Sequence, residues 1–269
     1  MDSERETRLL TTLSAAGKQI FATQDARDVL GSSANVNQVL SRLRHKRWLK
    51  RLSKRLYLIL PFEAGMDGDF TVSSLLIANY LAEPSVIAYW SALSHHGFTE
   101  QISHTTFVAT TQKKKKVEIK DLGLRFKFIT LPPAKMFGQE TLWIEGQAVS
   151  VTDPTKTVVD CLDHPELCGG IVEAAKGLWY ALTDRTIQPA QLTEYATRLG
   201  NRAVFKRMGY LAECMEIPLP REILDDWQTR ISAGYVLLEP SMGRKGVRNS
   251  RWQLWANVRV ADLTEWRWT

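Results

Sequence analysis

The sequence predicts an α+β protein with a small N-terminal domain and a larger C-terminal domain. Helical and hairpin patterns follow one another within the first 62 residues, and a block of strands precedes a block of helices in the rest. The length of 269 residues also favours about two domains. Residues 63–70 hold two glycines and three acidic residues, a composition typical of a linker. We therefore expect domains over residues 1–62 and 71–269, joined by this linker.

The composition is that of an ordinary soluble globular protein, with 44% hydrophobic and 24% charged residues. The polar N-terminus shows no secretory signal, and no apolar run approaches the roughly 20 residues that span a bilayer. Cys161, Cys168 and Cys214 lack CxxC spacing, which favours reduced thiols over a disulfide framework or a zinc finger. We expect a cytoplasmic protein that does not contact a membrane.

Three helical patterns open the N-terminal domain. Ser3 and Glu6 form a capping-box pattern at the start of the first helix. Thr23 can cap a second, short helix, and Ser32 or Ser33 can cap a third. The apolar residues of these helices are spaced for one buried side each: Leu9, Leu10, Leu13, Ala26, Val29, Leu30, Val36, Val39, Leu40 and Leu43.

A basic hairpin pattern follows the third helix. Residues 48–52 and 56–60 alternate or run apolar around Ser53-Lys54-Arg55. Three helices followed by such a hairpin is the order of a winged helix-turn-helix, whose third helix reads DNA in the major groove. The sequence thus predicts an N-terminal winged helix-turn-helix domain followed by a larger mixed α+β C-terminal domain. Arg55 stands where glycine would suit a tight turn better.

The excess positive charge is confined to the N-terminal domain. Residues 1–62 contain 12 Lys/Arg and 5 Asp/Glu, whereas the rest of the chain contains 23 and 24. Eight of the basic residues, and no acidic residue, lie between Arg42 and Arg55. A focused positive field attracts a polyanion. A solvated surface is the alternative, but the helix–hairpin context favours double-stranded DNA as the partner.

The side-chain types suggest a division of roles on this domain. Amides and arginine on the third helix can pair with base edges, whereas basic residues at the helix end and on the hairpin can neutralise phosphates. For each amide, hydrogen bonding to surface water is the alternative. The predicted base contacts are Ser33, Asn35, Asn37, Gln38, Ser41 and Arg42. The predicted phosphate contacts are Arg44, Arg47, Lys50, Arg51, Lys54 and Arg55.

The C-terminal domain shows helical patterns over 71–82 and 85–96, then strands over 105–111, 116–120 and 124–130. A hairpin is expected across Glu145-Gly146, with its second strand ending near residue 151. Helices dominate from Pro154 to about Arg230, and strands return at 235–238 and 252–260. Because strands and helices form separate blocks, the pattern favours α+β over a doubly wound sheet.

Several residues could suggest an enzyme, but each has a structural interpretation. His95 and His96 are adjacent and should point to different sides, and no acidic residue is suitably spaced for a metal site. Asp153-Pro154 is typical of a helix cap followed by a first-turn proline. Glu118-Ile119-Lys120 matches the end of a nuclease signature, so a metal-dependent nuclease is the enzymatic alternative. We expect no enzyme activity, no cofactor and no metal.

Two basic clusters lie in the C-terminal domain. Lys113–Lys116 should form the exposed tip of a hairpin. Residues 240–261 contain basic residues and no acidic one, and Trp252 and Trp255 among them should form a strand face packed on the core. The basic residues could form a second contact surface, made of Arg244, Lys245, Arg248 and Arg251.

Five segments resemble conserved blocks of the AbiEi antitoxin family of type IV toxin–antitoxin systems. Residues 84–97 (PSVIAYWSALSHHG) are similar to its P-S-V-I-x-Y-W-S-A-L-x-x-H-G stretch, and residues 151–157 (VTDPTKT) to its V-T-D-P-x-K-T block. Residues 168–171 (CGGI), 206–211 (KRMGYL) and 246–252 (GVRNSRW) fit the family as well. The matches run from about residue 20 to 258, so the resemblance covers nearly the whole chain.

The resemblance implies a bifunctional protein involved in phage defence. Its winged helix would bind repeats in its own promoter and repress the operon. Its C-terminal domain would counteract a cognate AbiEii-like nucleotidyltransferase toxin, for which a stable complex is not required. The alternative is a plain transcription regulator whose C-terminal domain senses a ligand or a protein partner.

Overall fold

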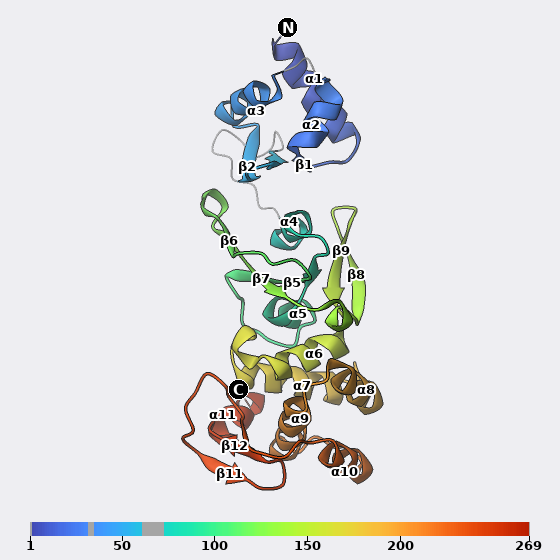
Figure 1. The fold of residues 1–269 in the computed structure, drawn as a ribbon, viewed down its shortest axis with the longest axis vertical. Helices are drawn as coiled ribbons and strands as arrows, with labels where there is room; N and C mark the ends of the chain where they lie inside the picture. Colours follow the sequence, from blue (N-terminus) through green and yellow to red (C-terminus); the bar gives the residue numbers. More distant parts are fainter. Residues whose placement is uncertain (1, 32–34, 61–72, 269) are drawn as a thin grey trace. The chain divides into compact units, whose positions relative to one another are not determined.

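The computed structural model describes residues 2–31, 35–60 and 73–268. They fall into two compact units: Met1–Leu81 with Glu118–Gly123, and Ala82–Val117 with Leu124–Thr269. The fold is mixed α+β, as the sequence predicts (Figure 1). The predicted linker, residues 63–70, lies outside the described residues. Within the described ranges, every helix is too short or too polar to cross a membrane.

The first unit consists of helices around a small antiparallel sheet of strand order β1-β3-β2. The predicted helices and hairpin are confirmed, whereas β1 is too short for its alternation to be recognised in the sequence. The elements are α1 (Asp2–Ala15), β1 (Ile20–Ala22), α2 (Thr23–Leu30), α3 (Val36–His45), β2 (Leu49–Ser53), β3 (Leu56–Ile59) and α4 (Ser74–Leu81).

The apolar sides of α1, α2 and α3 meet in one core. Val29 and Leu30 are partly buried against this core. The predicted capping box at the start of α1 is wrong, since Ser3 lies inside that helix. The Glu6 carboxylate instead contacts Lys46 Nζ just beyond α3, which ties the first helix to the third. The core consists of Leu9, Leu10, Leu13, Phe21, Ala26, Val36, Val39, Leu40, Leu43, Leu49 and Tyr57.

A six-stranded sheet has the order β6-β7-β5-β4-β9-β8 and both parallel and antiparallel pairs. All of its strands except β6 lie wholly in the second unit, because the segment Glu118–Gly123, which holds most of β6 and all of η2, is counted with the first unit. The predicted helix over 85–96 is wrong in its first residues, because Val86–Ile87 forms the strand between β5 and β9. The elements are β4 (Val86–Ile87), α5 (Tyr89–His95), β5 (Thr105–Thr110), β6 (Val117–Ile119), η2 (Lys120–Leu122), β7 (Leu124–Thr130), η3 (Pro133–Lys135), β8 (Gln139–Ile144) and β9 (Gln147–Thr152).

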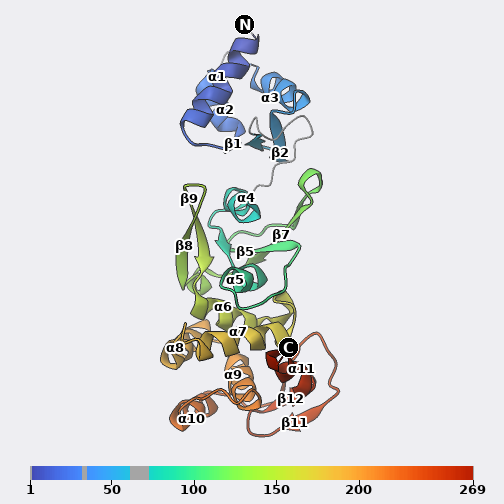
Figure 2. The ribbon, with the colours of Figure 1, turned by 180° about the vertical axis from the view of Figure 1, so that it is seen from behind.

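Helices and a second small sheet complete this unit. In both views α6 and α7 lie between the six-stranded sheet and the C-terminal elements (Figures 1 and 2). One hydrophobic core runs through the sheet, the helices and the C-terminal strands. The elements are α6 (Pro154–Asp163), η4 (Pro165–Leu167), α7 (Ile171–Thr183), α8 (Pro189–Leu199), α9 (Ala203–Cys214), α10 (Arg221–Thr229), β10 (Val236–Leu237), β11 (Val247–Asn249), β12 (Leu254–Ala256), α11 (Val260–Thr264) and η5 (Glu265–Trp268).

Trp252 holds the C-terminal strands against α9. Its side chain is fully buried, and its Nε1 donates to Glu213 Oε2 over 2.8 Å. A Cβ atom at Gly209 would lie only 2.1 Å from the nearest ring atom of Trp252. The sequence places Trp252 in a strand, but it lies in the turn before β12, whereas Trp255 lies in β12 and is half-buried. The ring thus needs a glycine beneath it.

Replacing Gly209 with alanine should destabilise the second unit. The added methyl group would overlap the buried ring of Trp252, and overpacking of this kind costs about 1–3 kcal/mol. Urea denaturation would measure the decrease in stability. Gly243→Ala is a matched control, since a Cβ there meets nothing within 4 Å. Unchanged stability of Gly209→Ala would contradict the proposed packing.

Candidate nucleic-acid interface

The third helix presents a polar side away from the core of the first unit. Asn35 caps it, because its Oδ1 accepts the Gln38 N–H over 3.2 Å. The predicted caps Ser32 and Ser33, and with Ser33 one predicted base contact, lie outside the described residues. The exposed residues of the helix include Asn37, Gln38, Ser41, Arg44 and His45, and Arg42 is half-buried.

A groove of about 690 Å³ lies between α2, α3 and the β2–β3 hairpin. Asn37, Ser41 and Arg44 reach it from α3, because they lie one turn apart on one side of the helix. Gln38 and Arg42 lie on the neighbouring side and do not line it. Among the described residues, basic side chains from all three elements line the groove and no acidic one does: Arg27, Arg44, Arg51, Lys54 and Arg55.

Arg27 is a groove residue that the sequence analysis overlooks, because it lies outside the basic run 42–55. The available signal is its spacing from Gln24: the two exposed residues lie three apart on α2 and both line the groove. Thr23 lines it as well, at the first turn of α2. The start of a helix carries partial positive charge, so its position adds to the field of the basic side chains.

α2 carries two carboxylates, and neither lines the groove. Asp28 accepts a hydrogen bond from Gln24 Nε2 over 2.9 Å. Asp25 accepts hydrogen bonds from Lys18 Nζ (2.6 Å) and from the Ala22 N–H (2.7 Å). Burial opposes ionisation of Asp25, but these two hydrogen bonds outweigh it and hold its pKa below the ordinary value. The acid therefore stays charged and paired at neutral pH, so the groove keeps its positive character.

The hairpin turn is closed by Arg51. Its Nε donates to the Ser53 carbonyl (3.0 Å) and its Nη2 to the Lys54 carbonyl (3.1 Å). The strand register shifts between Arg51 and Ser53, and Arg55 does not have a positive φ, so the turn does not need a glycine at that position. The Thr23 N–H donates to the Arg55 carbonyl over 2.8 Å, which fastens the turn to α2. Arg51 thus positions the turn in addition to lining the groove.

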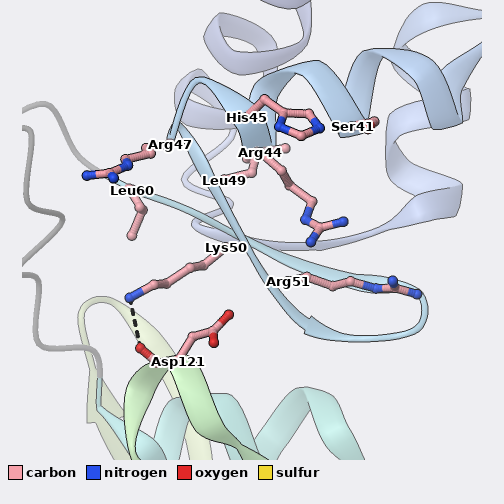
Figure 3. A pocket seen from close by; sticks show the side chains of 9 residues that line it. All are labelled: Ser41, Arg44, His45, Arg47, Leu49, Lys50, Arg51, Leu60 and Asp121. Carbon is pink, nitrogen blue, oxygen red and sulfur yellow. Dashed lines mark hydrogen bonds between the residues drawn. The ribbon is translucent and has the colours of Figure 1, made fainter.

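Two predicted phosphate contacts lie outside this groove. Figure 3 shows Arg44 and Arg51 on one side of the hairpin and Arg47 on the other. Lys50 lines the neighbouring pocket, and its Nζ donates to the carbonyl of Asp121, a residue of the segment Glu118–Gly123 of the same unit (3.0 Å; Figure 3). The groove brings Arg44, Arg51, Lys54 and Arg55 together, and the neighbouring pocket brings Arg47 and Lys50 together with Arg44 and Arg51.

Arg47 ends α3 in a left-handed conformation, with φ of 59°. Its N–H donates to the Arg44 carbonyl (3.0 Å) and the Trp48 N–H to the Leu43 carbonyl (2.9 Å). This pair of bonds is the Schellman motif, in which the left-handed position is usually glycine. The chain keeps an arginine where glycine would be less strained.

Arg47→Gly should therefore raise the free energy of unfolding of the first unit by about 1 kcal/mol, since a side chain in the left-handed region costs about that much. Urea denaturation followed by circular dichroism would measure it. Arg44→Gly is the matched control, because glycine inside the same helix should lower stability by about 1 kcal/mol. A decrease in stability of Arg47→Gly would show that the arginine is needed for the fold.

The four residues of the predicted second basic surface have different surroundings, and two of them contact neighbouring side chains. Arg251 Nε lies 2.7 Å from Glu213 Oε1, so its charge is neutralised. The guanidinium carbon of Arg248 lies 4.6 Å from the ring centre of Trp255. Arg244 and Lys245 are exposed in the loop before β11.

The residues considered for catalysis have mostly structural surroundings. Asp153 Oδ1 accepts the Lys156 N–H over 2.7 Å, which confirms the predicted helix cap. Burial raises the pKa of the Cys168 thiol, which disfavours a nucleophilic thiolate. Among the described residues, Glu118 belongs to no group of three metal-ligating side chains.

The predicted hairpin at Lys113–Lys116 is wrong, because this loop joins β5 to β6, which are separated by β7.

The expectation that His95 and His96 point apart is also wrong. Their ring centres lie 5.0 Å apart, and Glu140 of β8 lies beside them. A regular helix would separate adjacent side chains, but His96 is the first residue beyond α5.

No protein-family model matches the chain, and no curated protein matches it. Among solved structures, the crystal structure of the RV2827C protein from Mycobacterium tuberculosis is similar, with a TM-score of 0.70 at 14% sequence identity. The likeness covers 99% of this chain and 95% of that chain. At this identity it concerns the fold alone, and it extends over both α+β units.

Proposed function

We propose that the first unit is a winged helix-turn-helix domain that binds double-stranded DNA. The observation that carries the proposal is the groove between α2, α3 and the hairpin, whose lining within residues 2–31, 35–60 and 73–268 includes five basic residues and no acidic one. The chain order α1-β1-α2-α3 followed by a β-hairpin supports it, since a reading helix and a wing are arranged in this order in such domains.

The contacts divide by position. Lys54 and Arg55 at the hairpin turn, with Arg27 and Arg44 on the helices, would neutralise phosphates of a DNA backbone that follows the groove. Asn37 and Ser41 lie beside this backbone path, and Gln38 and Arg42 lie on the adjoining side of α3. The residues of both sides would meet base edges if α3 enters the major groove.

The protein would act as a cytoplasmic transcriptional autorepressor and as the antitoxin of a type IV toxin–antitoxin system. The antitoxin half rests on the resemblance of residues 84–97, 151–157 and 246–252 to the AbiEi blocks. The second unit would counteract a nucleotidyltransferase-like toxin, with no stable complex required. A plain regulator that senses a ligand or partner would share the DNA-binding unit and lack the toxin.

Wing and helix variants should affect DNA binding differently. Lys54→Ala or Arg55→Ala should weaken binding to all sequences alike and lower the salt slope by about 1 for each phosphate that is no longer neutralised. Asn37→Ala or Arg42→Ala should cost about 1–3 kcal/mol at one base pair and relax the preference there. Titration of labelled upstream DNA and of a scrambled fragment, at two salt concentrations, would measure both effects.

Arg8→Ala is the matched control for charge, because Arg8 is exposed on α1 and does not line the groove. It should leave affinity and salt slope nearly unchanged. Equal, weak binding of the wild type to both fragments would contradict a specific repressor. Wing variants that changed sequence preference while helix variants did not would reverse the assigned roles.

The antitoxin half predicts rescue that is separable from repression. Co-expression of the full-length protein with the nucleotidyltransferase-like protein of a neighbouring reading frame should restore growth. The double variant Lys54→Ala/Arg55→Ala, expressed from an unrelated promoter, should rescue equally well, because the groove is needed for DNA alone. If neither protein restores growth, the plain regulator is the better interpretation.

A further inference from the structure

Two histidines and a glutamate form a cluster of metal-ligating side chains in the second unit. His95 ends α5, His96 follows it, and Glu140 lies on β8. One nitrogen from each histidine and one carboxylate oxygen lie within 4.8 Å of one another. Imidazole nitrogen and carboxylate oxygen are donors that zinc accepts in proteins.

The two histidines lie at the end of α5. Gly97 has a φ of 71°, and the Phe98 N–H donates to the Leu93 carbonyl over 3.0 Å. This is the pattern of a helix that stops at a left-handed glycine. His96 occupies the C-cap, and the centre of its ring lies 5.0 Å from that of His95.

His96 is the fixed member of the cluster. Its side chain is 7% exposed, and its Nε2 lies 2.7 Å from the carbonyl oxygen of Thr152. Because a carbonyl can only accept, Nε2 carries the proton, and in the neutral ring Nδ1 presents a lone pair. A bond from the second ring nitrogen to a carbonyl is also what orients histidine ligands of metal ions.

The free lone pair of His96 faces a carboxylate. Nδ1 lies 4.0 Å from Glu140 Oε1, too far for a hydrogen bond. Both atoms are acceptors, so a cation between them would satisfy both. Glu140 and His95 are exposed, and their side chains can rotate by the roughly 1 Å needed to reach zinc bonds of about 2.0–2.2 Å, while His96 stays in place.

We propose that His95, His96 and Glu140 bind one divalent transition-metal ion, for which Zn²⁺ is the probe. Three protein ligands leave the fourth tetrahedral position to solvent. The ion would join the end of α5 to the β8–β9 hairpin, because the ligands come from α5 and β8 and the bond that orients His96 comes from β9.

The test is a titration of metal-free, tag-free full-length protein with Zn²⁺ against a chromophoric chelator. One Zn²⁺ per chain is expected, and Co²⁺ should give the absorption bands of a four-coordinate ion. His95→Ala, His96→Ala and Glu140→Gln should each lower the affinity by about tenfold or more. His104→Ala, Glu145→Gln and Cys214→Ser are the matched controls and should keep the wild-type affinity, since none of the three residues belongs to the cluster.

Glu140→Gln separates loss of metal binding from loss of folding, because it replaces only one carboxylate oxygen of an exposed side chain. The circular dichroism spectrum and the melting temperature of the metal-free protein should therefore stay unchanged. Wild-type affinity retained in both Glu140→Gln and His95→Ala would overturn the site. So would the absence of stoichiometric Zn²⁺ binding by the wild type, or abolished binding in Cys214→Ser alone.

Discussion

The second unit depends on the buried guanidinium of Arg207. Nη1 donates to the Leu162 carbonyl over 2.7 Å and to the Asp163 carbonyl over 3.2 Å, where α6 ends. Nη2 and Nε donate to the carbonyls of residues 237 and 238 at the end of β10. Burial lowers the pKa of this guanidinium, but four carbonyl partners compensate for the missing hydration. One side chain of α9 therefore fixes both the end of α6 and the C-terminal sheet.

The AbiEi-like blocks meet one another around this interaction. Arg207 and Gly209 belong to one block, and Trp252, which covers Gly209, belongs to another. In the same way, a Cβ at Gly169 would lie 3.0 Å from the ring of Trp90, which comes from the first block. These residues are explained by close packing and by satisfied carbonyls. These segments therefore contribute to how the second unit holds together.

Much of the fold could be predicted because periodicity and capping are local. The buried stripe of α3, the strand Leu124–Thr130 and the Asp153 cap follow from residues close in sequence. The strand Val86–Ile87 could not be predicted, since two residues show no alternation and their place in the sheet depends on partners roughly 20 and 60 residues away.

The same distinction applies to the candidate sites. The basic run 42–55 is visible in the sequence, but the groove it lines also needs Arg27, which only the packing of α2 against the hairpin brings into place. For His95 and His96, the expected divergence of adjacent side chains is not observed, since their ring centres lie 5.0 Å apart. The third member of the cluster, Glu140, comes from β8, and only the packing of that strand beside the end of α5 brings it there.

The hydrogen bond between the Thr23 N–H and the Arg55 carbonyl has a consequence for how the groove could be used. Because it fastens the hairpin tip to the start of α2, the basic side chains are carried by a backbone that is already ordered. A polyanion that follows them would not have to immobilise a loose wing, so association would cost little backbone entropy. Affinity would then depend on side-chain charge and ionic strength more than on refolding of the hairpin.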